Sequence, residues 1–175
     1  MNNSLMALLR FVHILSGIFW VGATLVLAAF VLPAARAVGP GAGALMSQLM
    51  QRQKLQLWIN VSMTLAILAG FALYGLDSRI SGGGFGRSAT GMTLGLGALL
   101  AIAAAGVGGA MGKPTGRKLG EIAQRMQEAQ RGGGAPPANL VAEAQPLQRK
   151  MQRALTIMSV LLVLSATTMA IARYM

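Results

Sequence analysis

The chain has no cysteine, one histidine and four acidic residues in 175 positions. Without cysteine it has neither a disulfide nor a thiolate metal site. A single histidine excludes bis-histidine haem ligation within one chain. All the acids lie outside the long apolar runs, which argues against a hydrolytic triad, a carboxylate cluster for a hard cation and a carboxylate-driven transporter. They are Asp77, Glu121, Glu128 and Glu143.

Four long runs without lysine, arginine or acid dominate what is present. They are Phe11–Ala35, Leu55–Leu76, Ser88–Gly112 and Ala154–Ala172. A helix needs about 20 apolar residues to cross the hydrocarbon core of a bilayer. Each run is long enough, and the mean hydropathy of +0.59 agrees. The sequence therefore predicts an all-α, four-transmembrane-helix bundle forming one integral membrane domain over 1–175, with helices near 5–38, 44–76, 88–112 and 138–173.

The net charge of +11 comes from basic residues in the loops beside the predicted spans. Lysine and arginine in such loops set topology and contact anionic lipid, so we expect no nucleic-acid partner. Eleven of the 15 lie in the first and third loops, which share one side of the membrane. The positive-inside rule then places these two loops and the anionic lipid inside, and both termini outside.

The third loop, 113–153, carries apolar residues at helical spacing on both sides of a glycine-rich stretch. We predict an inner helical hairpin in which Thr115–Gln130 pairs with Ala138–Arg153; a solvated basic loop is the alternative. We also expect 44–54 to run into the second span without a break, Pro33 to kink or end the first helix, and Pro146 to bend the fourth. Glycine pairs in the third span indicate tight packing within the bundle or a docking face.

The histidine lies inside the first predicted span, where an ionisable group is a functional hypothesis by default. Helical geometry places His13, Gly17, Trp20 and Thr24 on one stripe. Gly17 would leave a notch one turn from the imidazole, open to a flat group such as a porphyrin or to a neighbouring helix. Arg10 and Arg173, both near the outer end, would suit haem propionates or lipid phosphate.

Methionine is the remaining ligand type for a haem iron or for copper. Met92 and Met169 lie toward the same outer end as His13 and are the candidate metal ligands beside it. Two other roles for His13 stay open. It could be a neutral ring that donates to a hydroxyl or carbonyl of a facing helix and only fixes packing, or a group that handles protons.

The first span, FVHILSGIFWVGATLVLAAFVLPAAR, resembles the opening helix of the CopD-like and HemJ-like group of small bacterial membrane proteins. The shared pattern is similar to L-H-I-x-x-x-x-W-x-G, with His13, Trp20 and Gly22 in matching places. The second span fits the group loosely. The resemblance implies a four-span protein of the bacterial cytoplasmic (inner) membrane with His13 on the haem side, or a copper protein. The lysine that HemJ-like proteins carry in the third span is missing here.

The leading hypothesis is a CopD/HemJ-like protein that binds haem b or copper near the outer face through His13. The runner-up is a structural accessory subunit of a larger respiratory or photosynthetic complex, or a homo-oligomer, without chemistry of its own. In that case the third span and the inner hairpin would be docking surfaces. The sequence assigns no catalytic residue.

Overall fold

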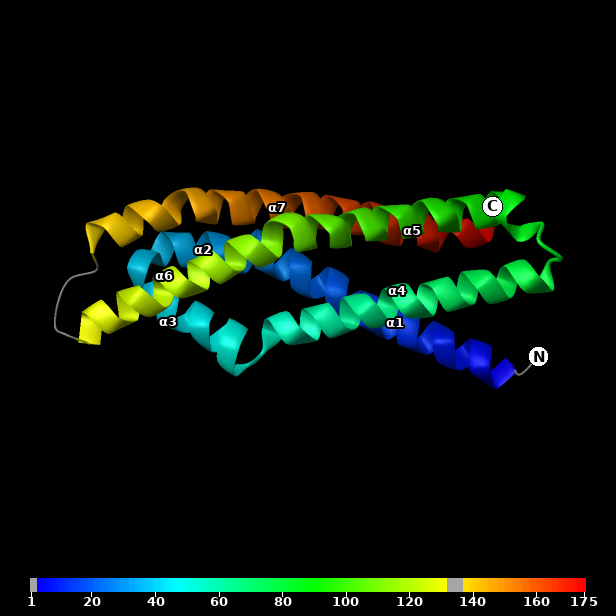
Figure 1. Ribbon diagram of the computed structural model, residues 1–175. Helices are drawn as coiled ribbons and strands as arrows, with labels where there is room; N and C mark the ends of the chain where they lie inside the picture. The colour runs from blue at the N-terminus through cyan, green and yellow to red at the C-terminus, as the bar shows by residue number, and fades with distance from the viewer. Residues whose placement is uncertain (1–2, 132–136) are drawn as a thin grey trace.

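The computed structural model describes residues 3–131 and 137–175, and these residues are almost entirely helical (Figure 1). The predicted hairpin turn at 132–136 lies outside the described residues. In chain order the elements follow one another as α1 (Asn3–Val26), η1 (Leu27–Val31), α2 (Leu32–Val38), η2 (Gly39–Gly41), α3 (Ala42–Ser47), η3 (Gln48–Arg52), α4 (Leu55–Ile80), η4 (Phe85–Arg87), α5 (Ala89–Val107), η5 (Gly108–Gly112), α6 (Lys113–Arg131), α7 (Ala138–Ile171) and η6 (Ala172–Tyr174).

Four continuous helical stretches are long and apolar enough to cross a membrane, which confirms the four predicted spans. They are Asn3–Val38, Leu55–Ile80, Ala89–Arg131 and Ala138–Tyr174. Large apolar side chains cover the outside of the bundle, among them Phe11, Phe30, Leu68 and Leu99. A soluble protein rarely exposes so much contiguous apolar surface. The chain is therefore a multi-pass membrane protein whose outer surface contacts lipid.

The spans associate as two pairs, α1 with α4 and α5 with α7 (Figure 1). The pairs meet in a core cluster formed by Trp20, Leu27, Ile59, Ala66, Ala104 and Leu162. They diverge toward the end that holds both termini and the α4–α5 loop, here called the terminal end. The opposite end, which holds α2, α3, α6 and the first half of α7, is called the basic end. Small residues allow the close approach within a pair: a Cβ at Gly97 of α5 would lie 2.8 Å from Met169 Cγ of α7.

Two of the prolines inside continuous helical stretches follow a π-helical segment. Pro33 follows η1 and Pro114 follows η5. A proline ring clashes with the carbonyl of the residue four positions earlier, and the wider π turn accommodates it. The predicted kink or end at Pro33 is thus replaced by a local widening, after which the helix continues to Val38. Pro146 does not interrupt α7.

The π turn at η1 leaves the Ala28 carbonyl without a backbone donor, and a side chain of α7 donates to this carbonyl instead. The Leu32 N–H donates to the Leu27 oxygen, five residues back. By the same register the Ala28 oxygen would face the nitrogen of Pro33, which has no hydrogen. Gln152 Nε2 donates to this oxygen at 2.9 Å. An unpaired carbonyl costs free energy in hydrocarbon, so Gln152 ties α7 to α1 at this point.

The second predicted helix, 44–76, is wrong at its start and short at its end. The helix is interrupted at residues 53 and 54, where Lys54 has a φ of 53° in the left-handed region. η3 closes with a five-residue bond from Gln53 N–H to the Gln48 oxygen, and α4 begins at Leu55. α4 then runs to Ile80, beyond Asp77. The resulting bend, called the elbow, separates α3 and η3 from the axis of α4 (Figure 1).

At the basic end α6 packs along the first half of α7, as the apolar spacing predicts. A second apolar cluster joins them, made of Ile122, Leu140, Ala144, Leu119, Met126 and Leu147. The predicted boundary between third span and hairpin is wrong, because α5, η5 and α6 form one helical stretch to Arg131. Arg36 NH2 donates to the Gln148 oxygen at 2.6 Å, which fastens α2 to this hairpin.

Candidate functional site

The only histidine of the chain links α1 to α4. His13 Nδ1 lies 2.7 Å from the backbone oxygen of Ala66. A carbonyl oxygen only accepts, so Nδ1 carries the proton and donates. In membrane proteins such interhelical bonds contribute about 0.6 to 1.7 kcal/mol each. This is the packing role that the sequence left open for His13.

Gly70 makes this bond possible. It lies one turn after Ala66 on α4, and a Cβ at Gly70 would lie 2.9 Å from His13 Cε1 and 3.2 Å from Nδ1. Any side chain at this position would therefore push the imidazole away from the Ala66 oxygen. The signal in the sequence is the pair of small residues Ala66 and Gly70, because small residues four positions apart permit close approach of two helices. Sequence analysis did not assign Gly70 a role.

Donation from Nδ1 fixes the chemistry of the other ring nitrogen. In a neutral imidazole with the proton on Nδ1, Nε2 holds the lone pair and is a ligand or acceptor. Histidines that bind metals commonly donate their second ring nitrogen to a backbone carbonyl in this way, which sets tautomer and orientation. The same bond thus serves packing and leaves Nε2 in its ligating form.

The rest of the predicted stripe divides into an open and a packed part. No atom lies within 4 Å of a Cβ placed at Gly17, so the notch beside His13 is open. Trp20 and Thr24 are instead buried, and the Trp20 side chain is 2% exposed in the core cluster. Thr24 donates to the Trp20 oxygen on its own helix. Trp20 is therefore a core residue and not a wall of an open site.

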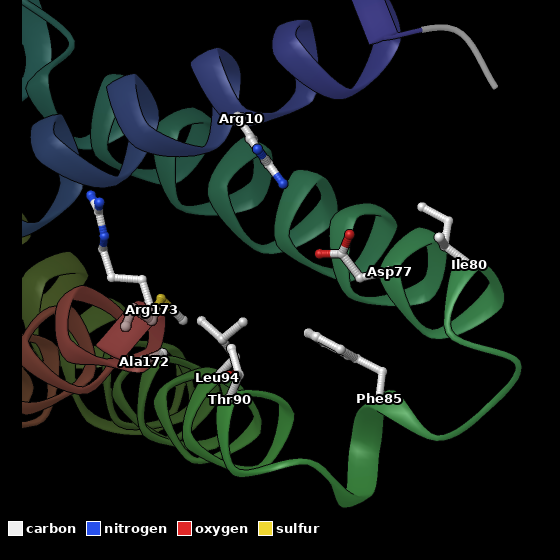
Figure 2. A pocket seen from close by; sticks show the side chains of 9 residues that line it. Arg10, Asp77, Ile80, Phe85, Thr90, Leu94, Ala172 and Arg173 are labelled. Carbon is white, nitrogen blue, oxygen red and sulfur yellow. The ribbon is translucent and has the colours of Figure 1, made fainter. Parts of the chain in front are cut away.

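A cavity of about 390 Å³ opens at the terminal end, where the two helix pairs diverge. Figure 2 shows Arg10 on α1, Asp77 on α4 and Arg173 near the C-terminus directed into the space between the pairs. Phe85 and Leu94 add apolar walls, and Met169 also lines the cavity. The structure thus brings Arg10 and Arg173 to one cavity, and the lining of this cavity does not include His13.

Asp77 is the residue of this cavity that the sequence analysis missed. It appeared there only as one of the four acidic residues outside the apolar runs. In residues 3–131 and 137–175, the one ion pair within 4 Å joins Arg117 and Glu121, so the three cavity charges are not paired with one another. Two guanidinium groups and one carboxylate leave the cavity with a net positive charge. Such a site favours an anionic group.

The two candidate methionine ligands are separated. Met169 lines the cavity beside Arg173. Met92 does not line it, and its side chain is 58% exposed on α5. Within the described parts of the chain, no three histidine, cysteine, aspartate or glutamate side chains come together in a group that could hold a metal ion. A bare metal ion would therefore depend on His13 and thioether sulfur.

Comparison with known proteins gives no family, no curated relative and no solved structure that matches this chain. The geometry of His13 and of the cavity is therefore the basis on which a function is proposed.

We predict that Gly70→Ala destabilises the protein through His13. The added Cβ displaces the imidazole and should lower the free energy of unfolding by about 1–3 kcal/mol, the usual cost of overpacking. Unfolding in mixed detergent micelles measures it. Gly75→Ala is the matched control on α4, because its Cβ would meet nothing within 4 Å. In a His13→Ala background the cost of Gly70→Ala should largely vanish; an unchanged cost would contradict the account.

Proposed function

We propose that this multi-pass membrane protein binds haem b near the terminal end, where His13 Nε2 would ligate the iron. The observation that carries the proposal is the 2.7 Å contact of His13 Nδ1 with the Ala66 oxygen. It holds the ring in the tautomer whose Nε2 is free to ligate. The open space at Gly17, one turn along α1 from His13, supports the approach of a flat group.

The donor set favours haem over a bare copper ion. A porphyrin brings four nitrogen ligands, so one imidazole suffices on the protein side. Copper would need several protein ligands, and those available are His13 and Met169. Binding of copper by His13 and Met169 is the alternative to haem, and the available ligands support it less well. The resemblance of the first span to CopD-like and HemJ-like proteins supports either form.

Arg10 and Arg173 would hold the carboxylate groups of the cofactor. Both line the cavity at the terminal end, and Arg10 lies one turn from His13 on α1. Charge-assisted bonds between guanidinium and carboxylate are strong and directional. Met169 lines the same cavity, and its thioether sulfur would be the candidate for a second iron ligand. Met92 is too exposed to serve from its observed position.

The second candidate is a structural accessory subunit of a larger membrane complex. It is favoured by Gly106 and Gly109 on the third span, which are exposed and have no atom within 4 Å of an added Cβ. Small residues on an outer helix face allow close approach of a helix from another chain. The α6–α7 hairpin, with its many basic side chains, would then be the docking surface outside the membrane.

For orientation we propose the cytoplasmic membrane of a bacterium, with the basic end inside. The first and third loops at this end carry most of the lysines and arginines, and the positive-inside rule keeps such loops in the cytoplasm. Both termini and the cavity at the terminal end then face the periplasm. His13, inward of Arg10 on α1, would lie in the outer half of the bilayer.

The haem proposal predicts a Soret band in gently purified protein, at about one haem per chain, and its loss in His13→Ala. Ser16→Ala is the matched control, because Ser16 bonds only to its own helix. It should keep the band. Absorption spectra with a copper assay provide the measurement. Folded protein with neither chromophore nor stoichiometric copper would refute the proposal, and fixed co-purifying subunits in that case would favour the accessory role.

The orientation proposal predicts opposite labelling of two single-cysteine variants. The chain has no cysteine, so each introduced thiol is unique. Ser81→Cys in the α4–α5 loop should react with a membrane-impermeant maleimide on intact cells. Gln124→Cys on α6 should react only after lysis; both positions are exposed. The reverse pattern would place the basic end outside.

A further inference from the structure

A second cavity, of about 420 Å³, lies on the side of the bundle at the elbow. We call it the elbow groove. One wall is α1 with η1, and the other is η3 with the first residue of α4. Its lining carries no polar side chain, and consists of Ile18, Phe19, Gly22, Ala23, Val26, Leu27, Val31, Leu49 and Leu55.

The interruption of the helix at residues 53 and 54 creates this groove. The left-handed backbone of Lys54 turns η3 away from the axis of α4, so that α3 and η3 do not pack along α1 as a straight helix would (Figure 1). Gly22 deepens the groove, since no atom lies within 4 Å of a Cβ built there. A non-glycine residue in the left-handed region carries strain. The elbow is therefore an imposed feature of the fold.

The groove is long enough to hold an acyl chain across one hydrocarbon leaflet. From Ile18 to Val31 the lining covers 13 residue steps of α1 and η1, about 20 Å at 1.5 Å per residue. Half of the hydrocarbon core is about 15 Å thick. The groove is thus longer than one leaflet, and it extends toward the basic end, where Leu49 and Leu55 flank it. A single acyl chain matches this length and its apolar lining.

Two exposed cations lie in the chain segment that forms the second wall of the groove. Arg52 and Lys54 lie between Leu49 and Leu55 in sequence, and both are exposed. The chain has no acidic residue before Asp77. Among the described residues neither cation is within 4 Å of a carboxylate, whereas Arg36 of the same loop donates to the Gln148 oxygen. Arg52 and Lys54 therefore lack an anion from the chain itself.

We propose that the elbow groove binds one anionic phospholipid from the leaflet at the basic end. Its acyl chain lies along Gly22, and its phosphate lies between Arg52 and Lys54. A basic side chain near an anionic membrane surface contributes favourably to lipid binding. An apolar groove, next in sequence to two cations without a carboxylate partner, suits an anionic lipid better than a free phosphate or an apolar helix. The inference is independent of haem binding.

The test compares lipids by native mass spectrometry on delipidated protein. Phosphatidylglycerol should bind more tightly than phosphatidylcholine of the same chain length. The double variant Arg52→Gln with Lys54→Asn should bind phosphatidylglycerol about 30-fold more weakly, the equivalent of two such charge interactions. Asparagine tolerates the left-handed backbone at position 54. Arg79→Gln with Arg87→Gln, at the terminal end, removes the same charge and should keep the affinity.

A third variant tests the groove itself. Gly22→Leu fills the space along α1 and should abolish tight binding of both lipids, while the unfolding temperature shows that the variant folds. Inorganic phosphate at millimolar concentration should not displace the lipid. Equal affinity of the wild type for the two lipids, equal losses in the two double variants, displacement by phosphate, or a stable dimer that excludes lipid would each overturn the proposal.

Discussion

In hydrocarbon a polar side chain has no water to bond, so it donates to a backbone carbonyl of its own helix or of a neighbouring helix. Three such bonds of 2.9 Å or less join the apolar parts of the spans, and a longer one of 3.3 Å joins Tyr74 of α4 to the Gly91 oxygen of α5. His13 donates to Ala66 of α4, Ser165 donates to Gly97 of α5 at 2.7 Å, and Gln152 donates to Ala28 of η1. They tie α1 to α4, α7 to α5, and α7 to α1. Each needs a residue that admits a close approach or leaves a carbonyl free: Gly70, Gly97 and Pro33.

The same three bonds explain where the molecule is open. Two of them hold a helix within its pair, and the third, from Gln152, joins the pairs toward the basic end. At the terminal end the pairs diverge around the cavity with Arg10, Asp77 and Arg173, and the Tyr74 hydroxyl of α4 donates to the Gly91 oxygen of α5 at 3.3 Å. The site therefore lies between this longer bond and the Gln152 bond toward the basic end. His13 lies between these regions and fixes the helix that presents Arg10.

The sequence predicted the spans and the α6–α7 pairing because both depend on apolar periodicity, which is local information. It did not predict the break at Lys54, because neither Gln53 nor Lys54 has the backbone preferences of glycine or proline. It placed Arg10 and Arg173 at one end correctly, since depth follows from position in a span. The acceptor of the His13 hydrogen bond could not be predicted, because every residue has a backbone carbonyl. The only local indication is Gly70, whose lack of a side chain leaves room for the ring. Asp77 was missed because its direction depends on how the pairs diverge.

The central claim is that His13 donates from Nδ1 to Ala66 and leaves Nε2 free to ligate. The single histidine gives one assignable pair of ring signals in solid-state ¹⁵N NMR of the protein in lipid bilayers. The account predicts a protonated Nδ1 with strong hydrogen-bond coupling and an Nε2 without a proton, bound to iron when haem is present. A ring protonated on Nε2 with a bare Nδ1 would contradict it.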